Sequence, residues 1–146
     1  MLSDNISMLR MLNGYSQEEV ATRVDVSRQA YAKWEKGDTL PDVLHCQKLA
    51  ALYDTTIDAL LNSDAKVGQT ALTPAPKGKH IFGTVKLNDH GQVVIPKKAR
   101  AMFQLQPGDE MVVLGDEAEG LAMIRADVFE ARLQKLWSQA VTKQEE

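Results

Sequence analysis

The sequence predicts a multi-domain chain, with an all-α bundle of five short helices followed by a small β-rich domain that ends in a helix. Three observations support this fold class. Apolar residues recur at helical spacing over residues 3–62, and the pattern lapses in a stretch with two prolines and two glycines. From residue 80 the spacing of the apolar residues changes towards every second position, which is typical of strands. We therefore expect a helical domain at 1–63, a linker at 64–79 and the second domain at 80–146.

Capping residues predict where the helices of the first domain begin and end. Ser3 is expected to cap the first helix, which ends at Asn13-Gly14. Ser16-Gln17-Glu18-Glu19 forms a capping box, because the hydroxyl and the Glu19 carboxylate can satisfy free amides at a helix start. Pro41 is expected to open the fourth helix, and a last short helix follows Thr55-Thr56.

The second and third helices have the layout of a helix-turn-helix. One helix runs from Ser16 to Val24, Asp25 breaks it, and the next runs from Ser27 to Gly37. Tyr31 and Trp34 share the helical spacing of the apolar face, which favours the core, although aromatic rings can also stack on bases.

The opposite face of the third helix carries side chains suited to nucleic acid. Arginine matches guanine edges, glutamine matches adenine edges, and a small alanine admits a thymine methyl group. The residues on this face are Arg28, Gln29, Ala32, Lys33 and Lys36. Ser27 and Gln17, at the starts of the two helices, are expected to meet phosphates, because helix N-termini present free amides to anions.

Over residues 3–62 the chain resembles the Xre family of Cro- and phage-repressor-type helix-turn-helix domains. The shared motifs are SQEEVA, SRQA-x-x-KWE-x-G, the proline after it, and an L-A-x-x-Y ending. The resemblance implies a lambda-repressor-like five-helix domain that binds DNA, usually as a dimer on a two-fold operator. It also implies that Arg10 pairs with Glu35, which makes Glu35 structural. Asp25 departs from the family, which commonly has Gly in the turn.

Short strands dominate the expected second domain. About 50 residues with four strands make a weak core alone, so self-association is a physical expectation. The terminal helix either covers a sheet face or extends the dimer interface. The expected elements are strands at Ile81–Leu87, Val93–Ile95, Met111–Leu114 and Leu121–Ile124, a helix from Pro96 to Phe103, and a helix capped by Asp127.

Residues 79–125 resemble the AbrB/SpoVT/MazE family of swapped-hairpin domains through D-x-G-x-V-V-I-P, a short basic helix and L-x-P-G-D. The resemblance implies an interlocked homodimer. Matching positions give Lys86, Lys97, Lys98 and Arg100 as candidate phosphate contacts. Gln92 and Ala101 stand where DNA-binding members often have Arg, so a solvated basic rim on a dimerisation domain is an equal alternative.

The charge distribution bears on the partner more than the net charge does. The chain carries a formal net charge of −3, yet residues 77–100 hold six Lys and Arg side chains against Asp89 alone. Overall charge governs solubility, whereas a local patch governs phosphate contact. The charge pattern is therefore compatible with double-stranded DNA as the partner.

Several classes of protein are not expected. No stretch holds 18 consecutive apolar residues, and the N-terminus lacks the pattern of a signal peptide. The single Cys46 cannot form an internal disulfide, so we expect a reducing cytoplasm. The sequence shows no nucleophile–base pair, metal-ligand cluster or phosphate loop, so we expect neither an enzyme nor a cofactor.

Together the two resemblances imply a cytoplasmic, sequence-specific transcriptional regulator. It would act as a homodimer through residues 80–124, with higher oligomers left open, and place the helix Ser27–Lys36 in the major groove. The alternative is an antitoxin-like or protein-interaction module, in which the swapped-hairpin domain and the C-terminal helix bind a partner protein.

Overall fold

The structure, a computed structural model, describes residues 1–145, and the chain divides after Pro96 into two units, residues 1–96 and 97–146. This division groups residues 80–96 with the helical unit. The predicted domain limits at residues 63 and 80 stay predictions.

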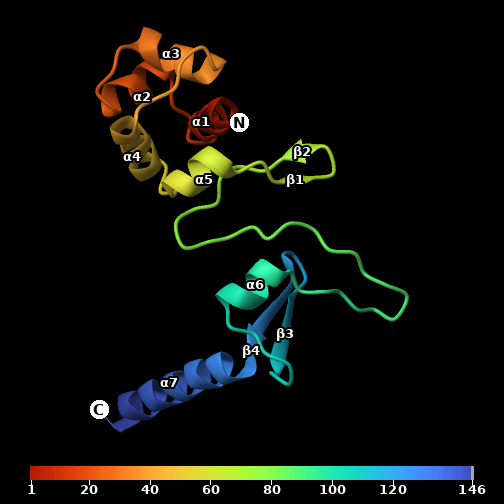
Figure 1. The fold of residues 1–146 in the computed structure, drawn as a ribbon. Coiled ribbons are helices and arrows are strands. Elements are labelled where there is room, and N and C mark those ends of the chain that lie inside the picture. Colours follow the sequence, from red (N-terminus) through yellow and green to blue (C-terminus); the bar gives the residue numbers. More distant parts are fainter. Residues whose placement is uncertain (146) are drawn as a thin grey trace. The chain divides into compact units, whose positions relative to one another are not determined.

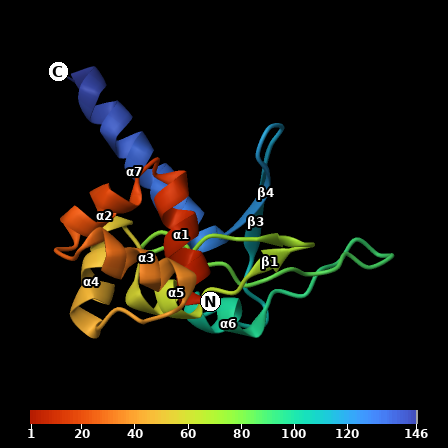
Figure 2. The same ribbon diagram turned by 90° about the horizontal axis from the view of Figure 1, so that it is seen from above.

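Five helices form the first part of unit one (Figure 1). They are α1 (Leu2–Leu12), α2 (Gln17–Arg23), α3 (Arg28–Lys36), α4 (Val43–Leu52) and α5 (Ile57–Asn62). α1 and α3 lie side by side in both views (Figures 1 and 2), and α2 packs against α3. The number and order of these helices confirm the prediction for this part of the chain.

Some of the predicted N-cap residues cap their helices in the structure, and others do not. The Ser16 capping box forms, because the Glu19 N–H donates to Ser16 Oγ at 3.2 Å and the Ser16 N–H donates to the Glu19 carboxylate at 2.7 Å. Ser3 is not a cap, because α1 begins one residue earlier at Leu2. Pro41 does not open α4, since the Asp42 carboxylate accepts the His45 N–H at 2.9 Å and caps that helix instead.

The core of unit one joins all five helices. Tyr31 is fully buried, and its ring meets Trp34 edge-on with centroids 6.0 Å apart, which confirms that both aromatic residues belong to the core. Each fully buried large apolar side chain contributes about 1.5–3 kcal/mol. The buried cluster consists of Ile6, Leu9, Val20, Ala21, Val24, Tyr31, Trp34, Leu49, Tyr53 and Leu60.

Residues 64–77, which we call the docked arm, contain regular structure within the segment that the sequence predicts to be a linker. They contain a two-stranded antiparallel hairpin of β1 (Lys66–Val67) and β2 (Thr70–Ala71). After β2 the chain returns towards α5 (Figure 1), and Pro74 is buried. The composition indicated a flexible segment, whereas in the structure the Thr55 hydroxyl donates to the Ala75 carbonyl at 2.6 Å and holds the end of the segment on the helical domain.

Two predicted strands are wrong. The structure has no strand at residues 81–87 or 93–95, although the turn between them forms, with the Asn88 N–H donating to the Gln92 carbonyl at 3.0 Å. A strand needs a neighbour for its backbone groups, and no strand in the described chain pairs with these segments. Apolar side chains are exposed here as a result, with Leu87 69% and Val94 75% accessible.

Unit two contains a β-hairpin between two helices. α6 (Lys97–Met102) precedes β3 (Met111–Asp116) and β4 (Gly120–Arg125), and α7 (Ala126–Glu145) follows them. The hairpin register runs from Met111 opposite Arg125 to Asp116 opposite Gly120. These elements confirm the predicted helix after Pro96, the strand pair and the final helix, which begins one residue before Asp127.

The described residues 1–145 include no helix that is both long and apolar enough to cross a membrane.

Ala21 tests the packing of α2 against α3. Its side chain is 1% exposed, and its carbonyl accepts the Val26 N–H at 3.0 Å across the turn. Ala21→Leu should lower the free energy of unfolding by about 1–3 kcal/mol, because the added carbons have no space at the helix crossing. Thr22→Leu, at the neighbouring exposed position, is the matched control. Equal chemical denaturation curves for the two variants would contradict this packing.

Candidate nucleic-acid interface

The turn between α2 and α3 sets the angle of the two helices. Asp25 adopts a left-handed backbone conformation with φ 61°, which Asp tolerates better than most residues. Its carboxylate lies 2.7 Å from Lys48 Nζ on α4, and this hydrogen bond lowers the pKa of Asp25 below its usual value. The turn therefore forms without the glycine of the Xre family, and Lys48, which the sequence analysis did not single out, supports it.

The two ends of α3 are capped as the sequence predicts. Ser27 Oγ accepts the Ala30 N–H at 3.1 Å, and Gly37 takes the left-handed conformation with φ 78°. The Ser27 oxygen is thus used inside the helix, while its O–H remains a donor. Ser27 lies exposed at the start of α3, beside the N–H groups of the first turn.

The burial of α3 divides its side chains into two faces. Tyr31 and Trp34 face the core, while Ala32 is half-buried. Four polar side chains of the predicted DNA-facing set are exposed: Arg28, Gln29, Lys33 and Lys36. The structure therefore brings the predicted side chains of α3 onto one accessible helix, with two donors for base edges near its N-terminus.

An ion pair beneath α3 links three helices. Arg10 on α1 donates to both Glu35 oxygens, with Nε–Oε1 2.6 Å and Nη2–Oε2 3.1 Å. Gln17 on α2 donates to Glu35 Oε2 at 2.9 Å, and Arg10 also donates to the Tyr15 carbonyl at 3.0 Å. The pairing of Arg10 with Glu35, expected from the Xre resemblance, is confirmed.

The electrostatics of this pair favour the charged state of both partners. Burial alone would raise the pKa of Glu35, but hydrogen bonds from Arg10 and Gln17 outweigh it and hold that pKa below its ordinary value. The hydrogen bond with Glu35 raises the pKa of Arg10. Burial raises the pKa of Tyr31 and Tyr53, whose hydroxyl oxygens lie 3.5 Å apart, so both stay protonated.

Gln17 has a role that the sequence analysis missed. Its side-chain amide points to Glu35, so its free group at the start of α2 is the backbone N–H of the first turn. The position of Gln17 at the start of a helix predicted a phosphate contact. Nothing in the local sequence indicated its hydrogen bond with Glu35, which lies 18 residues away. A contact of Gln17 with phosphate stays a prediction, now through the backbone.

The second set of predicted phosphate contacts is divided between the two units. Lys86 lies in the extended part of unit one, whereas α6 carries Lys97, Lys98 and Arg100, all exposed, around the buried Ala99. α6 thus concentrates three cations in six residues. The sequence pattern could identify these cations but not their division between units.

Arg125, which the sequence analysis did not single out, holds the end of α6 in unit two. Its Nη1 donates to the Gln104 and Phe103 carbonyls at 3.2 and 3.4 Å. The same guanidinium donates to both Asp127 oxygens, at 3.0 and 2.9 Å. Arg125 therefore connects the segment after α6 to the start of α7 and fixes the basic helix against the hairpin.

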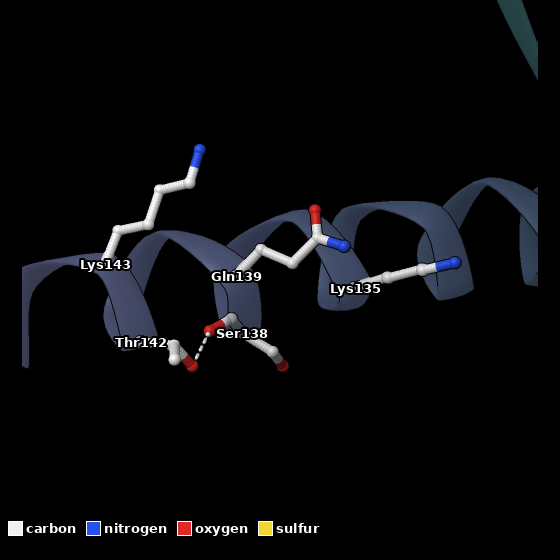
Figure 3. A pocket seen from close by; sticks show the side chains of 5 residues that line it. All are labelled: Lys135, Ser138, Gln139, Thr142 and Lys143. Carbon is white, nitrogen blue, oxygen red and sulfur yellow. Dashed lines mark hydrogen bonds between the residues drawn. The ribbon is translucent and has the colours of Figure 1, made fainter. Parts of the chain in front are cut away.

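A shallow pocket on α7 does not resemble a ligand site. Its lining side chains all come from one helix, and Figure 3 shows the Ser138 and Thr142 side chains on one side of it. The Thr142 hydroxyl donates to the Ser138 carbonyl at 2.9 Å, and the Ser138 hydroxyl donates to the Gln134 carbonyl. Both hydroxyl protons are therefore used within the helix. The lining residues are Lys135, Ser138, Gln139, Thr142 and Lys143.

Comparison with known proteins identifies the helical domain. The family model "Helix-turn-helix" (HTH_3) matches residues 6–60, which span α1 to α5. YgzD of Bacillus subtilis (strain 168), an uncharacterized HTH-type transcriptional regulator, is 33% identical over 57 residues, covering 39% of this chain and 86% of YgzD. The chain belongs to the helix-turn-helix family. Membership rests on the domain that presents α3, so the Xre-type part of the predicted resemblance is confirmed.

The chain also matches a longer relative and a solved structure. The HTH-type transcriptional activator BcrR of Enterococcus faecalis is 31% identical over 62 residues, or 42% of this chain, and the chain spans only 30% of BcrR. Among solved structures, the N-terminal DNA-binding domain of SinR from Bacillus subtilis has 24% identity and a TM-score of 0.43, covering 45% of this chain and 97% of that one. The swapped-hairpin resemblance of residues 79–125 lies entirely outside the family match at residues 6–60 and stays a prediction.

Glu35 provides the test of the ion pair. Glu35→Gln should lower the free energy of unfolding by about 3 kcal/mol, because it leaves Arg10 half-buried without an opposite charge. The double variant Arg10→Met/Glu35→Leu, which removes both charges, should recover much of that loss. Thermal denaturation of the single and double variants measures both effects. A double variant less stable than Glu35→Gln would contradict this account.

Glu35→Gln should also change how the free energy of unfolding depends on pH. Since the folded pKa of Glu35 lies below its unfolded value, the stabilisation is complete above the unfolded pKa and is lost as pH falls through the folded one. The stability of the wild type should therefore fall more steeply below about pH 4.5 than that of Glu35→Gln. Denaturation midpoints between pH 6 and 3 compare the two slopes, and parallel slopes would show that Glu35 does not titrate as described.

Proposed function

We propose that this helix-turn-helix chain is a sequence-specific, DNA-binding transcriptional regulator that places α3 in the major groove. The observation that carries the proposal is one helix face, where Arg28, Gln29, Lys33 and Lys36 are exposed while Tyr31 and Trp34 hold the helix in the core. Arginine and glutamine near the helix N-terminus suit guanine and adenine edges. Ala32 would admit a thymine methyl group.

Phosphate contacts would fix the register of α3 on the duplex. Ser27 and the backbone N–H of Gln17, at the starts of α3 and α2, supply the donors on this domain. In the second half, Lys86, Lys97, Lys98 and Arg100 supply further cations, which would raise affinity without base specificity. The role follows the names of the relatives, which are HTH-type regulators, and would place the protein with the DNA in the cytoplasm.

We further propose that the regulator is a homodimer through residues 80–124. The support is the extended segment at 81–95, which belongs to no strand of the described residues and in which five apolar side chains are exposed: Ile81, Val85, Leu87, Val93 and Val94. A second copy could supply the missing strands, as the swapped-hairpin resemblance implies. Two α3 helices on one dimer would meet half-sites separated by about 34–36 Å or a multiple of it.

An antitoxin-like or protein-interaction function is a second candidate. It is favoured by α7, in which every described residue from Glu130 on is exposed, including Leu136 at 62% and Trp137 at 71%. An apolar helix face of this kind suits a groove on a partner protein. A partner that copurifies with the wild type and not with Trp137→Ala would support this function. A homodimer that binds DNA with steep salt dependence and without a partner would weaken it.

Arg28 and Gln29 test the base contacts. Arg28→Ala or Gln29→Ala should weaken binding to a selected operator by about 1–3 kcal/mol while leaving the thermal melting unchanged. Lys36→Ala should instead weaken binding to all sequences alike and lower the salt dependence. Fluorescence anisotropy with operator and scrambled DNA measures this difference. Unchanged preference in both Arg28→Ala and Gln29→Ala would reject α3 as the recognition helix.

Val94 tests the homodimer. Val94→Lys places a charge on the extended segment and should shift the sedimentation of the full chain towards a monomer, because the proposed interface would bury that position. Val67→Lys, on β1 with 54% exposure, is the matched control and should leave the oligomeric state unchanged. A dimer that persists in Val94→Lys at micromolar concentration would overturn the proposed interface.

A further inference from the structure

The end of the docked arm is held by the connection between α4 and α5. The Thr55 hydroxyl donates to the Ala75 carbonyl at 2.6 Å, and the Lys77 N–H donates to the Asp54 carbonyl at 2.8 Å. Thr55 and Pro76 also form an isolated antiparallel bridge. Thr55 is a polar residue with only 6% exposure, so its hydroxyl depends on the arm for a partner.

The beginning of the docked arm is held as well. Asn5 on α1 is 2% exposed and donates to the Leu60 and Ser63 carbonyls at 2.9 and 3.0 Å, which fixes the end of α5. Within the arm, the Leu72 N–H donates to the Ala65 carbonyl at 2.8 Å and closes the β1–β2 hairpin. Lys77 is therefore the last residue of the arm that is held on the helical domain. The next residue, Gly78, takes a left-handed conformation.

We propose that the docked arm is part of the DNA-binding domain and that it limits the distance between the two recognition helices of the dimer. This inference rests on the proposed homodimeric regulator. The tether between the DNA-binding domain and the dimerisation segment then begins at Gly78. While the arm is docked, residues 64–77 add nothing to the distance that the tether can span, because both ends of the arm are fixed on one domain.

The length of the arm is large enough to decide which operators the dimer accepts. Its fourteen residues, fully extended, would span roughly 45–50 Å. Half-sites on one face of DNA are about 34–36 Å apart. A released arm would let the dimer reach a half-site one further turn away, whereas a docked arm restricts it. The structure thus connects a few hydrogen bonds at Thr55 and Asp54 to the choice of half-site spacing.

Two insertions of equal length in the full chain distinguish a docked arm from a simple linker. One variant carries Gly-Ser-Gly-Ser between Gly68 and Gln69, in the β1–β2 turn, and the other carries it after Gly78. Binding is measured on DNA duplexes with two half-sites at increasing separation. We expect the insertion after Gly78 to widen the range of accepted separations, and the insertion in the hairpin turn to leave the wild-type range unchanged. Equal widening by both insertions would overturn the proposal.

Hydrogen exchange of the full chain tests the arm without DNA. The amides of Leu72 and Lys77 should be protected in the wild type. Thr55→Val, which keeps the shape and removes the hydroxyl, should speed exchange at Lys77 roughly five- to tenfold. Thr70→Val, at an exposed position in the same arm, should leave it unchanged. Unprotected Leu72 and Lys77 amides in the folded wild type would reject the docked arm.

The two measurements separate failure of the inference from failure of the proposed function. Protected arm amides in a chain that binds no two-half-site DNA would reject the regulator and retain the arm as a folded segment, so its proposed effect on spacing would fall with the regulator. A chain that binds such DNA with equal tolerance in both insertion variants would retain the regulator and reject the arm's role.

Discussion

The ion pair between Arg10 and Glu35 is the interaction on which the helix-turn-helix domain depends. It joins α1 to α3, and Gln17 brings α2 into the same group of hydrogen bonds. Because breaking a buried pair leaves an uncompensated charge, the three helices are favoured in one arrangement. The exposed face of α3 is therefore held by charge beneath it as well as by the aromatic packing of Tyr31 and Trp34.

The acidic net charge of the chain is compatible with DNA binding because the charges are unevenly placed. On α3 the exposed side chains include Arg28, Lys33 and Lys36, while Glu35 faces inward and is neutralised by Arg10. α6 adds a second concentration of cations on the other unit. A phosphate near α3 or α6 would interact with the local electrostatic potential of that helix, which the net charge of the whole chain does not determine.

Local signals predicted much of the helical domain, and long-range contacts account for the rest. The Ser16 box, the Ser27 cap, Gly37 and the core aromatics could be identified because each acts within a few residues. The docked arm could not, because its place depends on Thr55, twenty residues from Ala75. Strands at 81–87 and 93–95 were wrong because alternating apolar residues specify a strand only where another strand is present to pair with it.

Sequence selection by α3 can be measured with the full chain, by selecting bound duplexes from random DNA over several rounds and sequencing them. If α3 reads base edges, we expect two enriched half-sites related by two-fold symmetry, with the preference at one or two base pairs lost when Arg28 or Gln29 is replaced by Ala. Duplexes enriched without any shared sequence, or an identical motif selected by the wild type and both variants, would contradict it.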